Sequence, residues 1–272
     1  VSVGALAPNL KVIAPVREWG WNRAEEMNYA KRNGIPVPER NSLFSTDENL
    51  WGRSIEAGEL EDPWSEPPEE AFAWTNPISK TPEEPTYLEI TFNRGLPLSL
   101  DGEEMRPIDL VEHLNHIAGE NGIGRVDHIE NRLVGIKSRE VYESPAGVVL
   151  HAAHKALESM TLSKDQARMK QRVAQEYSDV VYNGLWFTTH RRDLDAYVES
   201  TQRHVSGSVR MRLHKGSSTV VGRRSPRGLY SHQLATYDRD DTFDHRASEG
   251  FITIYGLPVR TQTFTQGDSD EA

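Results

Sequence analysis

The sequence predicts an α+β fold for the main part of the chain, because predicted strands and helices are grouped and do not alternate regularly. Residues 88–100 and 209–221 each show apolar residues alternating with polar ones on both sides of a turn, the pattern of an antiparallel hairpin with one buried face. Between these hairpins lie segments with apolar residues at helical spacing. An antiparallel sheet with packed helices accounts for these observations.

The N-terminal residues show a different order, one strand followed by one helix. The apolar run 11–15 (KVIAP) ends in proline and predicts a buried strand. Apolar residues then recur at helical spacing from Trp21 to Ala30, and Gly34 ends that helix. The pair is typical of the last unit of an α/β domain, to which we assign residues 1–39. A strand–helix pair packed on the following domain fits the pattern equally well.

Residues 41–56 come next, and Ser45 and Ser54 of this segment lie on either side of a turn predicted at the Trp-Gly pair 51–52. A short hydroxyl near glycine can approach a ligand closely, because glycine has no Cβ in the way. Serine also caps helices and closes turns, and for a serine taken alone that structural role is the better prediction. Residues 59–85 are rich in Glu and Pro, which predicts an ordered loop without a long helix.

The segment 124–142 combines four Lys/Arg and three acidic residues with regularly spaced apolar ones. A plain surface loop has no need of that apolar spacing, and a plain core strand would not carry so much charge. The pattern leaves two interpretations open. The segment is either a strand–turn unit with surface ion pairs, or a strand that leads into and out of a site with charged side chains at its rim.

The other elements are mostly helical. Helices are predicted over four ranges: 107–119, 145–160 with Ser144 as N-cap, 163–182 and 191–205. Residues 251–255 predict a last strand, and the polar, acidic residues after Arg260 predict a disordered tail.

Composition excludes several classes of protein. The 272 residues carry a net charge of -10, which argues against a nucleic-acid or anionic-membrane partner, since both bind basic surfaces. No apolar run approaches the roughly 20 residues of a membrane-spanning helix, and no secretory leader opens the sequence. The absence of cysteine excludes disulfides and cysteine nucleophiles. We therefore expect a soluble, cytoplasmic protein that handles small molecules.

Four motifs occur in the order in which one known family carries them. They are STDENLWGRSIE at 45–56, ENRLVGIKSREVYE at 130–143, YNGLWF at 182–187 and VVGRRSP at 220–226. Four motifs in order along most of the chain are a specific signal, whereas a single one is weak. The sequence therefore resembles the argininosuccinate synthase family, the ATP-dependent ligases that join citrulline to aspartate.

The resemblance implies three parts of the chain. These are a remnant of an α/β, adenine-nucleotide-α-hydrolase-like ATP-binding domain at 1–39, a synthetase and oligomerisation domain at 40–260, and a polar acidic tail at 261–272. It also implies a homotetramer that serves arginine biosynthesis or the urea cycle, with L-citrulline, L-aspartate and ATP (with Mg²⁺) as substrates.

In the family's reaction the citrulline ureido oxygen attacks the α-phosphate of ATP, giving a citrullyl-adenylate and pyrophosphate. The aspartate amine then displaces AMP. Positioning and charge stabilisation supply most of such an acceleration, so we predict no catalytic base.

The resemblance also names ligand positions, which we predict as the citrulline-binding residues: Ser45, Ser54, Glu130 and Tyr142. A carboxylate at Glu130 suits the ammonium group of citrulline, and the phenol of Tyr142 can donate to a carboxylate or carbonyl. Without the resemblance, a salt bridge from Glu130 to Arg132 or Arg139 and a half-buried ring for Tyr142 would be the better predictions.

Family members carry a glycine-rich pyrophosphate loop upstream of the first match, and the 272 residues contain no such loop. The sequence thus resembles about the C-terminal two thirds of a family member, and its ATP-binding residues stay unassigned. We expect the 272 residues alone to lack ligase activity. The alternative is a truncated, non-catalytic binding or assembly module of the same fold.

Two further groups of residues could carry chemistry. Arg223, Arg224 and Arg227 form a basic cluster that could hold phosphate or steer an anion, but we favour pairing with acids on a neighbouring subunit. The spacing H-x-x-H occurs at 113–116 and 151–154, which puts two imidazoles on one helix face. Neither pair has an obvious third ligand, so we predict no metal site.

Overall fold

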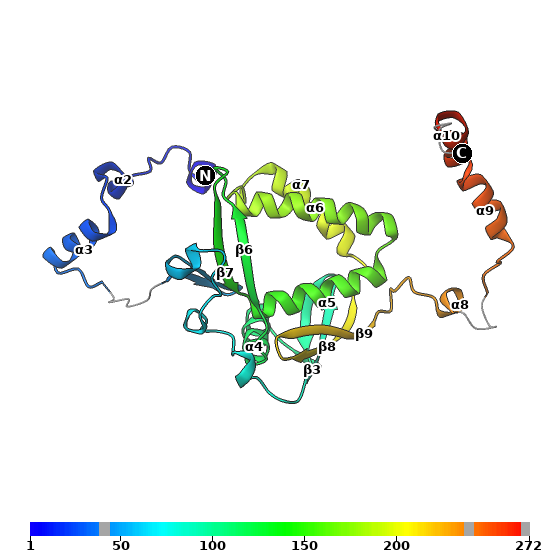
Figure 1. Cartoon of the computed structure of the whole chain (residues 1–272), viewed down its shortest axis with the longest axis horizontal. Helices are drawn as coiled ribbons and strands as arrows, with labels where there is room; N and C mark the ends of the chain where they lie inside the picture. The colour runs from blue at the N-terminus through cyan, green and yellow to red at the C-terminus, as the bar shows by residue number, and fades with distance from the viewer. Residues whose placement is uncertain (38–43, 237–241, 268–272) are drawn as a thin grey trace. The chain divides into compact units, whose positions relative to one another are not determined.

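The computed structural model describes residues 1–37, 44–236 and 242–267, and it divides into two units, residues 1–228 and 229–272 (Figure 1). The first unit contains two antiparallel sheets with packed helices, and the described part of the second unit is helical. The predicted α+β class is confirmed.

A five-stranded antiparallel sheet forms the larger core, with strand order β5-β4-β3-β8-β9. Its strands are β3 (Thr86–Asn93), β4 (Leu96–Leu100), β5 (Glu103–Glu104), β8 (Gly207–His214) and β9 (Ser217–Arg224). The two predicted hairpins are β3–β4 and β8–β9, and the pairing of β3 with β8 joins them into one sheet.

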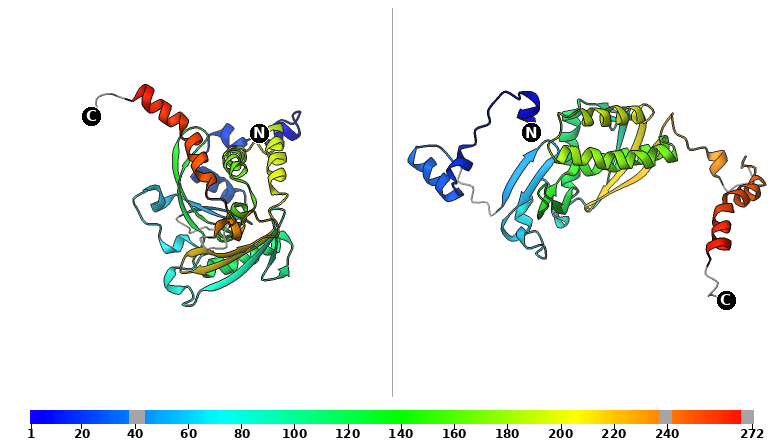
Figure 2. Two further views of the ribbon diagram at one scale, coloured as in Figure 1. Left: turned by 90° about the vertical axis from the view of Figure 1, so that its right-hand side faces the viewer. Right: turned by 90° about the horizontal axis from the view of Figure 1, so that it is seen from above.

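Helices α4 (Pro107–Glu120) and α5 (Pro145–Thr161) pack on this sheet, and α5 runs along β8 and β9 (Figures 1 and 2). Both begin with proline, whose fixed φ suits the first helical turn. Leu88 and Ile90 of β3 lie in one buried cluster with Leu114 of α4 and Leu157 of α5. Each such side chain contributes about 1.5–3 kcal/mol when fully buried, so this cluster is the main source of stability.

A second sheet of four antiparallel strands has the order β1-β2-β7-β6. Its strands are β1 (Ser45–Asn49), β2 (Gly52–Glu56), β6 (Arg125–Asn131) and β7 (Lys137–Glu143). The pairing of β2 with β7 brings the motif at 45–56 beside the motif at 130–143. The segment 124–142 is therefore a strand–turn–strand unit at the edge of this sheet.

The loop between the two sheets contains three short 3-10 helices: η1 (Gly58–Glu61), η2 (Glu69–Ala71) and η3 (Ile78–Lys80). It covers one face of the four-stranded sheet, where Leu60 and Ala71 pack against Ile55 and Val141. The prediction of an ordered loop without a long helix is confirmed.

Helices α6 (Lys164–Tyr182) and α7 (Thr189–Gln202) pack on each other around Val173, Val180 and Leu194. Ser163 caps α6 through a reciprocal capping box with its third residue. Ser144 stands at the N-cap of α5 as predicted, but its hydroxyl donates to the Trp51 carbonyl (2.8 Å) and does not cap the helix.

The first 37 residues form three helices, α1 (Ser2–Leu6), α2 (Pro15–Trp19) and α3 (Arg23–Arg32). The predicted helix is confirmed as α3, but the strand predicted at 11–15 is wrong. An isolated strand leaves its backbone groups unpaired, and no strand in the described residues pairs with this segment. Proline at residue 15 instead starts α2.

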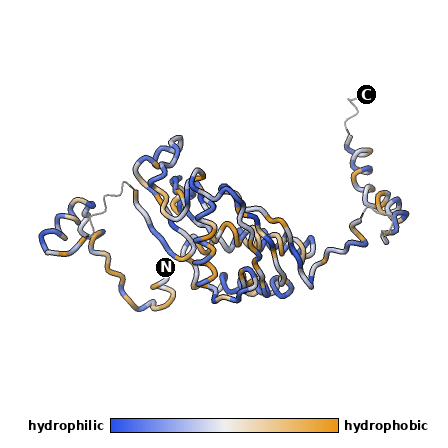
Figure 3. The backbone as a smooth tube through the Cα atoms, turned by 90° about the horizontal axis from the view of Figure 1, so that it is seen from below, coloured by the Kyte–Doolittle hydropathy of each residue, from blue (hydrophilic) through white to orange (hydrophobic). Residues whose placement is uncertain are grey.

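The second unit contains α8 (His232–Ala235), α9 (Ala247–Tyr255) and α10 (Leu257–Gln266). The strand predicted at 251–255 is wrong. The segment carries no strand partner among the described residues, and a helix satisfies its own backbone while Phe251 stacks on Tyr255 with ring centroids 5.1 Å apart. The disorder predicted after Arg260 is also wrong as far as Gln266, and residues 268–272 lie outside the described ranges. Figure 3 shows hydrophobic and hydrophilic residues interspersed along this C-terminal helical segment.

Across the described ranges, no helix has the length and apolar content needed to cross a membrane.

Candidate functional site

The four predicted ligand residues come one from each strand of the four-stranded sheet. Across the sheet they follow the strand order, with Ser45 on β1, Ser54 on β2, Tyr142 on β7 and Glu130 on β6. Ser54 and Tyr142 are direct cross-strand partners. Side chains alternate between the faces of a sheet, and directly paired residues share a face.

The register puts all four on one face. Asp47 pairs with Ser54 and shares the face of Ser45, two residues before it. On the other edge, Ser138 pairs with Glu130 and lies four residues before Tyr142. We call this face, which carries Ser45, Ser54, Glu130, Glu140 and Tyr142, the open face.

The opposite face is closed by the loop 57–85 and is held by Glu143, whose side chain is fully buried. This carboxylate accepts hydrogen bonds from the backbone N–H groups of Ala73, Trp74 and Thr75 (2.9–3.2 Å) and from the Thr75 hydroxyl (2.8 Å). Arg53 completes the set at 2.9 Å. The charge of Glu143 is thus compensated within the chain, and its role is to fasten the loop to the sheet.

Glu130 on the open face is also buried, at 8% exposure, but its partners are neutral. Its Oε1 accepts a hydrogen bond from the Tyr142 hydroxyl, and its Oε2 accepts one from the hydroxyl of Tyr182, the last residue of α6 (2.9 Å). Hydrogen bonding to Glu130 raises the pKa of Tyr182, and burial, followed by the same kind of hydrogen bond, raises the pKa of Tyr142. Both phenols therefore stay protonated and act as donors.

Neither arginine near Glu130 in the sequence pairs with it. Arg132 donates to Ser138 (2.8 Å) and lies 3.4 Å from Glu56, while Arg139 lies 2.6 Å from Asp127. Among the described residues, Glu130 forms no ion pair with any Lys, Arg or His. The salt-bridge interpretation of Glu130 is therefore wrong for the described residues.

A second carboxylate, Glu140, lies on the same face two residues before Tyr142. The Tyr142 hydroxyl is 2.8 Å from its Oε2. The phenol has one proton and cannot donate to Glu130 and Glu140 at once, so both contacts are satisfied together when Glu140 is protonated. Burial, with the nearby charges of Glu130 and Glu56, raises the pKa of Glu140 and favours that state.

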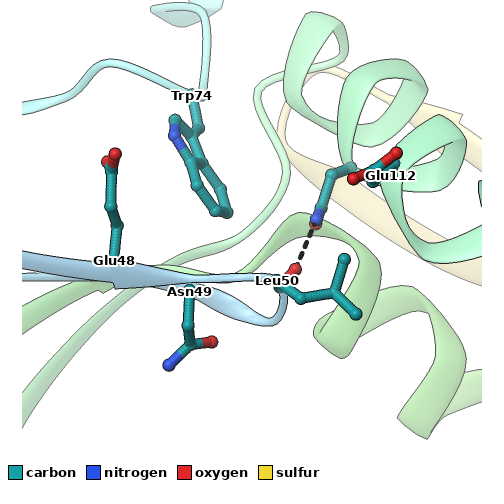
Figure 4. Close-up of a pocket in the computed structure, with 6 residues that line it drawn as sticks. Glu48, Asn49, Leu50, Trp74 and Glu112 are labelled. Atoms are coloured by element: carbon teal, nitrogen blue, oxygen red, sulfur yellow. Dashed lines mark hydrogen bonds between the residues drawn. The ribbon is translucent and has the colours of Figure 1, made fainter. Parts of the chain in front are cut away.

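The two serines are exposed or half-buried, and within the described residues neither hydroxyl forms a hydrogen bond. Their predicted alternative role in capping or turn closure is therefore not observed. Instead the turn between β1 and β2 is held from elsewhere. Asn115 of α4 donates to the Leu50 carbonyl (2.9 Å), the hydrogen bond drawn as a dashed line in Figure 4. It also accepts from the N–H of Ala146 at the start of α5 (2.9 Å).

Close approach of strands also positions Ser54. A Cβ on Gly52 would lie 2.6 Å from the Glu143 carbonyl oxygen, so only glycine lets β2 come this near to the end of β7.

A small pocket of about 450 Å³ lies beside the same turn (Figure 4). Glu48, Trp74 and Glu112 line it, together with Asn115, which donates to the Leu50 carbonyl.

The other candidate groups have mainly structural contacts. Arg224 forms an ion pair with Glu89 of its own sheet (2.6 Å), and Arg223 donates a hydrogen bond to Ser159 (3.0 Å). We expected acids of a neighbouring subunit as partners of this cluster, but the partner of Arg224 is an acid of the same chain. The ring of His154 contacts Gln202 at 2.9 Å. In the described ranges no group of three or more His, Cys, Asp or Glu residues could hold a metal ion.

Sequence reasoning missed two residues of this site, Glu140 and Tyr182. The spacing of two between Glu140 and Tyr142 on a strand is a signal that could have placed both on one face. Tyr182 lies 52 residues from Glu130 along the chain, and no local pattern links them.

Comparison with known proteins matches the chain to two family models. Residues 44–262 match the family model described as the arginosuccinate synthase C-terminal domain, and residues 1–36 match the arginosuccinate synthase N-terminal HUP domain. An argininosuccinate synthase of Dehalococcoides mccartyi is 57% identical over 267 residues, which is 98% of this chain and 66% of that protein. Those of Symbiobacterium thermophilum and Rubrobacter xylanophilus are each 56% identical and are covered to 67% of their length.

This chain thus spans about two thirds of the length of the curated relatives it matches. On the matches to both family domains and the identity over nearly all of its residues, the chain belongs to the argininosuccinate synthase family.

Proposed function

We propose that this chain is part of an argininosuccinate synthase, which condenses L-citrulline with L-aspartate at the expense of ATP and releases AMP and pyrophosphate. The observation that carries the proposal is the buried carboxylate of Glu130, which has no cationic partner among the described residues and shares a face with two hydroxyls that are free in the same residues. A buried charge of this kind needs a cation, and an amino-acid substrate supplies one in its ammonium group.

The open face accounts for binding of citrulline group by group. Glu130 receives the ammonium, the hydroxyls of Ser45 and Ser54 donate to carboxylate or ureido oxygens, and Tyr142 holds Glu130 in place from the neighbouring strand. These residues orient the ureido group and exclude water from the buried charge. None of them is assigned as a catalytic base, since orientation and charge stabilisation supply most of the acceleration in such a reaction.

ATP, with its Mg²⁺, is assigned to no residue of this chain, because the family's glycine-rich pyrophosphate loop has no counterpart in the 272 residues. We further propose that residues 1–39 belong to the nucleotide-binding domain, that residues 40–260 form the synthetase and oligomerisation domain, and that 261–272 are a polar tail. A cytoplasmic homotetramer is part of the same proposal.

The test is a pyrophosphate-release assay on the complete protein that contains this chain. Release is expected to require citrulline, aspartate and ATP together, and to stop when ornithine, which lacks the ureido group, replaces citrulline. Release that does not depend on citrulline would overturn the proposal. The 272 residues by themselves are expected to release no pyrophosphate, and turnover by this piece would contradict that expectation.

A further inference from the structure

Tyr182 is the one residue outside the four-stranded sheet that bonds to the Glu130 carboxylate among the described residues. It is half exposed, at 52%, and its hydroxyl donates to Glu130 Oε2 at 2.9 Å. In the described chain this hydroxyl has no other hydrogen-bond partner. Its position therefore depends on the end of α6, and its contact is with a residue of the open face.

The end of α6 holds Tyr182 firmly. Tyr182 is followed by the C-cap residue Asn183 and by Gly184, whose φ of +70° suits glycine. The Leu185 N–H donates back to the Val180 carbonyl (2.9 Å). Leu185 packs against the cluster that joins α6 to α7. The phenol is thus presented from a rigid helix terminus, independently of the strands that carry the rest of the site.

The two phenols hold different oxygens of Glu130 and come from different elements, Tyr142 from β7 and Tyr182 from α6. The terminal torsion of a glutamate is broad when nothing restrains it. A donor on each oxygen, approaching from two elements, restricts that rotation. A carboxylate has about four lone-pair sites, so two remain for a ligand.

Neutral donors have a further consequence. A lysine or arginine in the place of Tyr182 would orient the carboxylate but would also neutralise it and compete with an incoming ammonium group. Two phenols orient Glu130 and leave its negative charge uncompensated.

We infer that Tyr182 is a positioning residue, which fixes the Glu130 carboxylate for the ammonium group of the amino-acid substrate and so makes the α6–α7 pair part of the amine-recognition site. The inference rests on the proposed function, and it adds to the binding site a residue from outside the four-stranded sheet.

The test is steady-state kinetics of the complete protein carrying Tyr182→Phe. Loss of a hydrogen bond to a charged group is expected to raise the KM for citrulline about tenfold. The KM values for aspartate and ATP are expected to stay within about twofold, because the proposed function assigns Glu130 to citrulline. A second readout is the preference for citrulline over 5-ureidopentanoic acid, which lacks the α-ammonium group, and this preference is expected to fall in the variant.

The matched control is Tyr177→Phe. Tyr177 lies on the same helix and donates to a carboxylate over a similar distance, 2.8 Å, but its partner is Asp195 of α7. The control is expected to lower the melting temperature while leaving the preference for citrulline over the des-amino analogue unchanged.

The outcomes separate the two proposals. An active wild-type protein whose Tyr182→Phe variant keeps its citrulline KM and its preference for the α-ammonium group would overturn the role of Tyr182 alone. Equal rises in the KM for citrulline, aspartate and ATP would also overturn it, since they would indicate a general structural defect. A wild-type protein that does not use citrulline would overturn the proposed function, and the role of Tyr182 with it.

Discussion

Two buried glutamates on neighbouring strands, Glu143 of β7 and Glu130 of β6, meet opposite kinds of partners. Glu143 is fully buried on the closed face, where Arg53 and a set of backbone N–H groups surround it. Glu130 is almost as buried on the open face, but its partners are two neutral phenols. Burial alone therefore does not distinguish a structural carboxylate from a binding one.

The difference lies in where the compensating charge comes from. Removing a carboxylate from water is costly unless a cation or several donors replace the water. At Glu143 the chain supplies both, so the interaction contributes to folding. At Glu130 the described chain supplies two hydroxyl donors without a cation, which is the arrangement that our proposal assigns to the ammonium group of a substrate. The comparison yields four predictions, which run from the largest expected effect to the smallest.

The largest effect is expected for Glu143→Gln. The amide would direct N–H groups at the donors of Ala73, Trp74 and Thr75, and it would leave Arg53 without its buried partner. Breaking a buried pair costs about 3–5 kcal/mol, and we expect a loss of this size in the free energy of unfolding measured by urea denaturation. Glu48→Gln, at an exposed carboxylate 3.7 Å from the same arginine, is the control and should cost less than about 1 kcal/mol. Equal effects of the two substitutions would contradict the role given to Glu143.

Glu130→Gln is expected to have the opposite profile. Its free energy of unfolding should change by less than about 1 kcal/mol, because one phenol can still donate to the amide oxygen and the oxygen of the other phenol can accept from the amide NH2. The KM for citrulline in the complete protein should rise by about 10- to 100-fold, since a charge-assisted contact with the ammonium is lost. A variant that unfolds easily and binds citrulline normally would reverse the comparison.

Gly52→Ala should affect both faces together. Its Cβ would approach the Glu143 carbonyl oxygen to 2.6 Å and push β2 away from β7, which carries Tyr142. We expect a loss of about 1–3 kcal/mol in unfolding free energy, typical of overpacking, together with a raised KM for citrulline. Gly222→Ala in β9 is the matched control, because its Cβ would meet its nearest neighbour at an ordinary 3.7 Å. A harmless Gly52→Ala would show that the strand contact is not what positions Ser54.

The smallest effect concerns pH and Glu140. Burial raises the pKa of Glu140 above the ordinary value of 4.5, with Glu130 and Glu56 acting in the same direction and Tyr142 and Arg132 opposing. The folded state therefore binds this proton more tightly than the unfolded state, so the stabilisation is present at low pH and is lost as pH rises through the raised pKa. The measurement is the free energy of unfolding of wild type and Glu140→Gln, obtained by urea denaturation across pH 4 to 8.

Asp127 supplies the contrast to Glu140 within the same experiment. The hydrogen bond from Arg139 lowers the pKa of Asp127, so the contribution of Asp127 to the free energy of unfolding is lost as pH falls. This contribution is expected to be the same in the wild type and in Glu140→Gln. The wild type should lose stability relative to Glu140→Gln with rising pH. A constant difference between the two proteins would show that folding does not raise the pKa of Glu140.

Much of the fold follows from local patterns. Alternating apolar residues predicted both hairpins of the large sheet, and apolar residues at helical spacing predicted the helices from Pro107 to Gln202. The two wrong strands, at 11–15 and 251–255, share one cause. A short apolar run has the composition of a strand, but it becomes one only where another strand pairs with its backbone.

For the site, too, sequence motifs predicted some features and the tertiary structure decided others. The motifs at 45–56 and 130–143 were sufficient to identify the family and to select Ser45, Ser54, Glu130 and Tyr142 as ligand candidates. Sequence could not choose between an ion pair and an open carboxylate at Glu130, because two arginines, Arg132 and Arg139, lie close to it along the chain. The strand register decided this point by sending Arg139 to the face opposite Glu130.

By itself, then, the sequence determined the fold class, the family and the residue types of the site, since these depend on composition, spacing and motif order. The tertiary structure decided that the four ligand candidates share one face and that Tyr182 reaches Glu130 from the end of a helix. It also decided that Glu143 has a cationic partner, whereas Glu130 has none among the residues that the structure describes. The physical reason is that charge compensation depends on distance in space, and residues far apart in sequence become neighbours only when strands pair and helices pack.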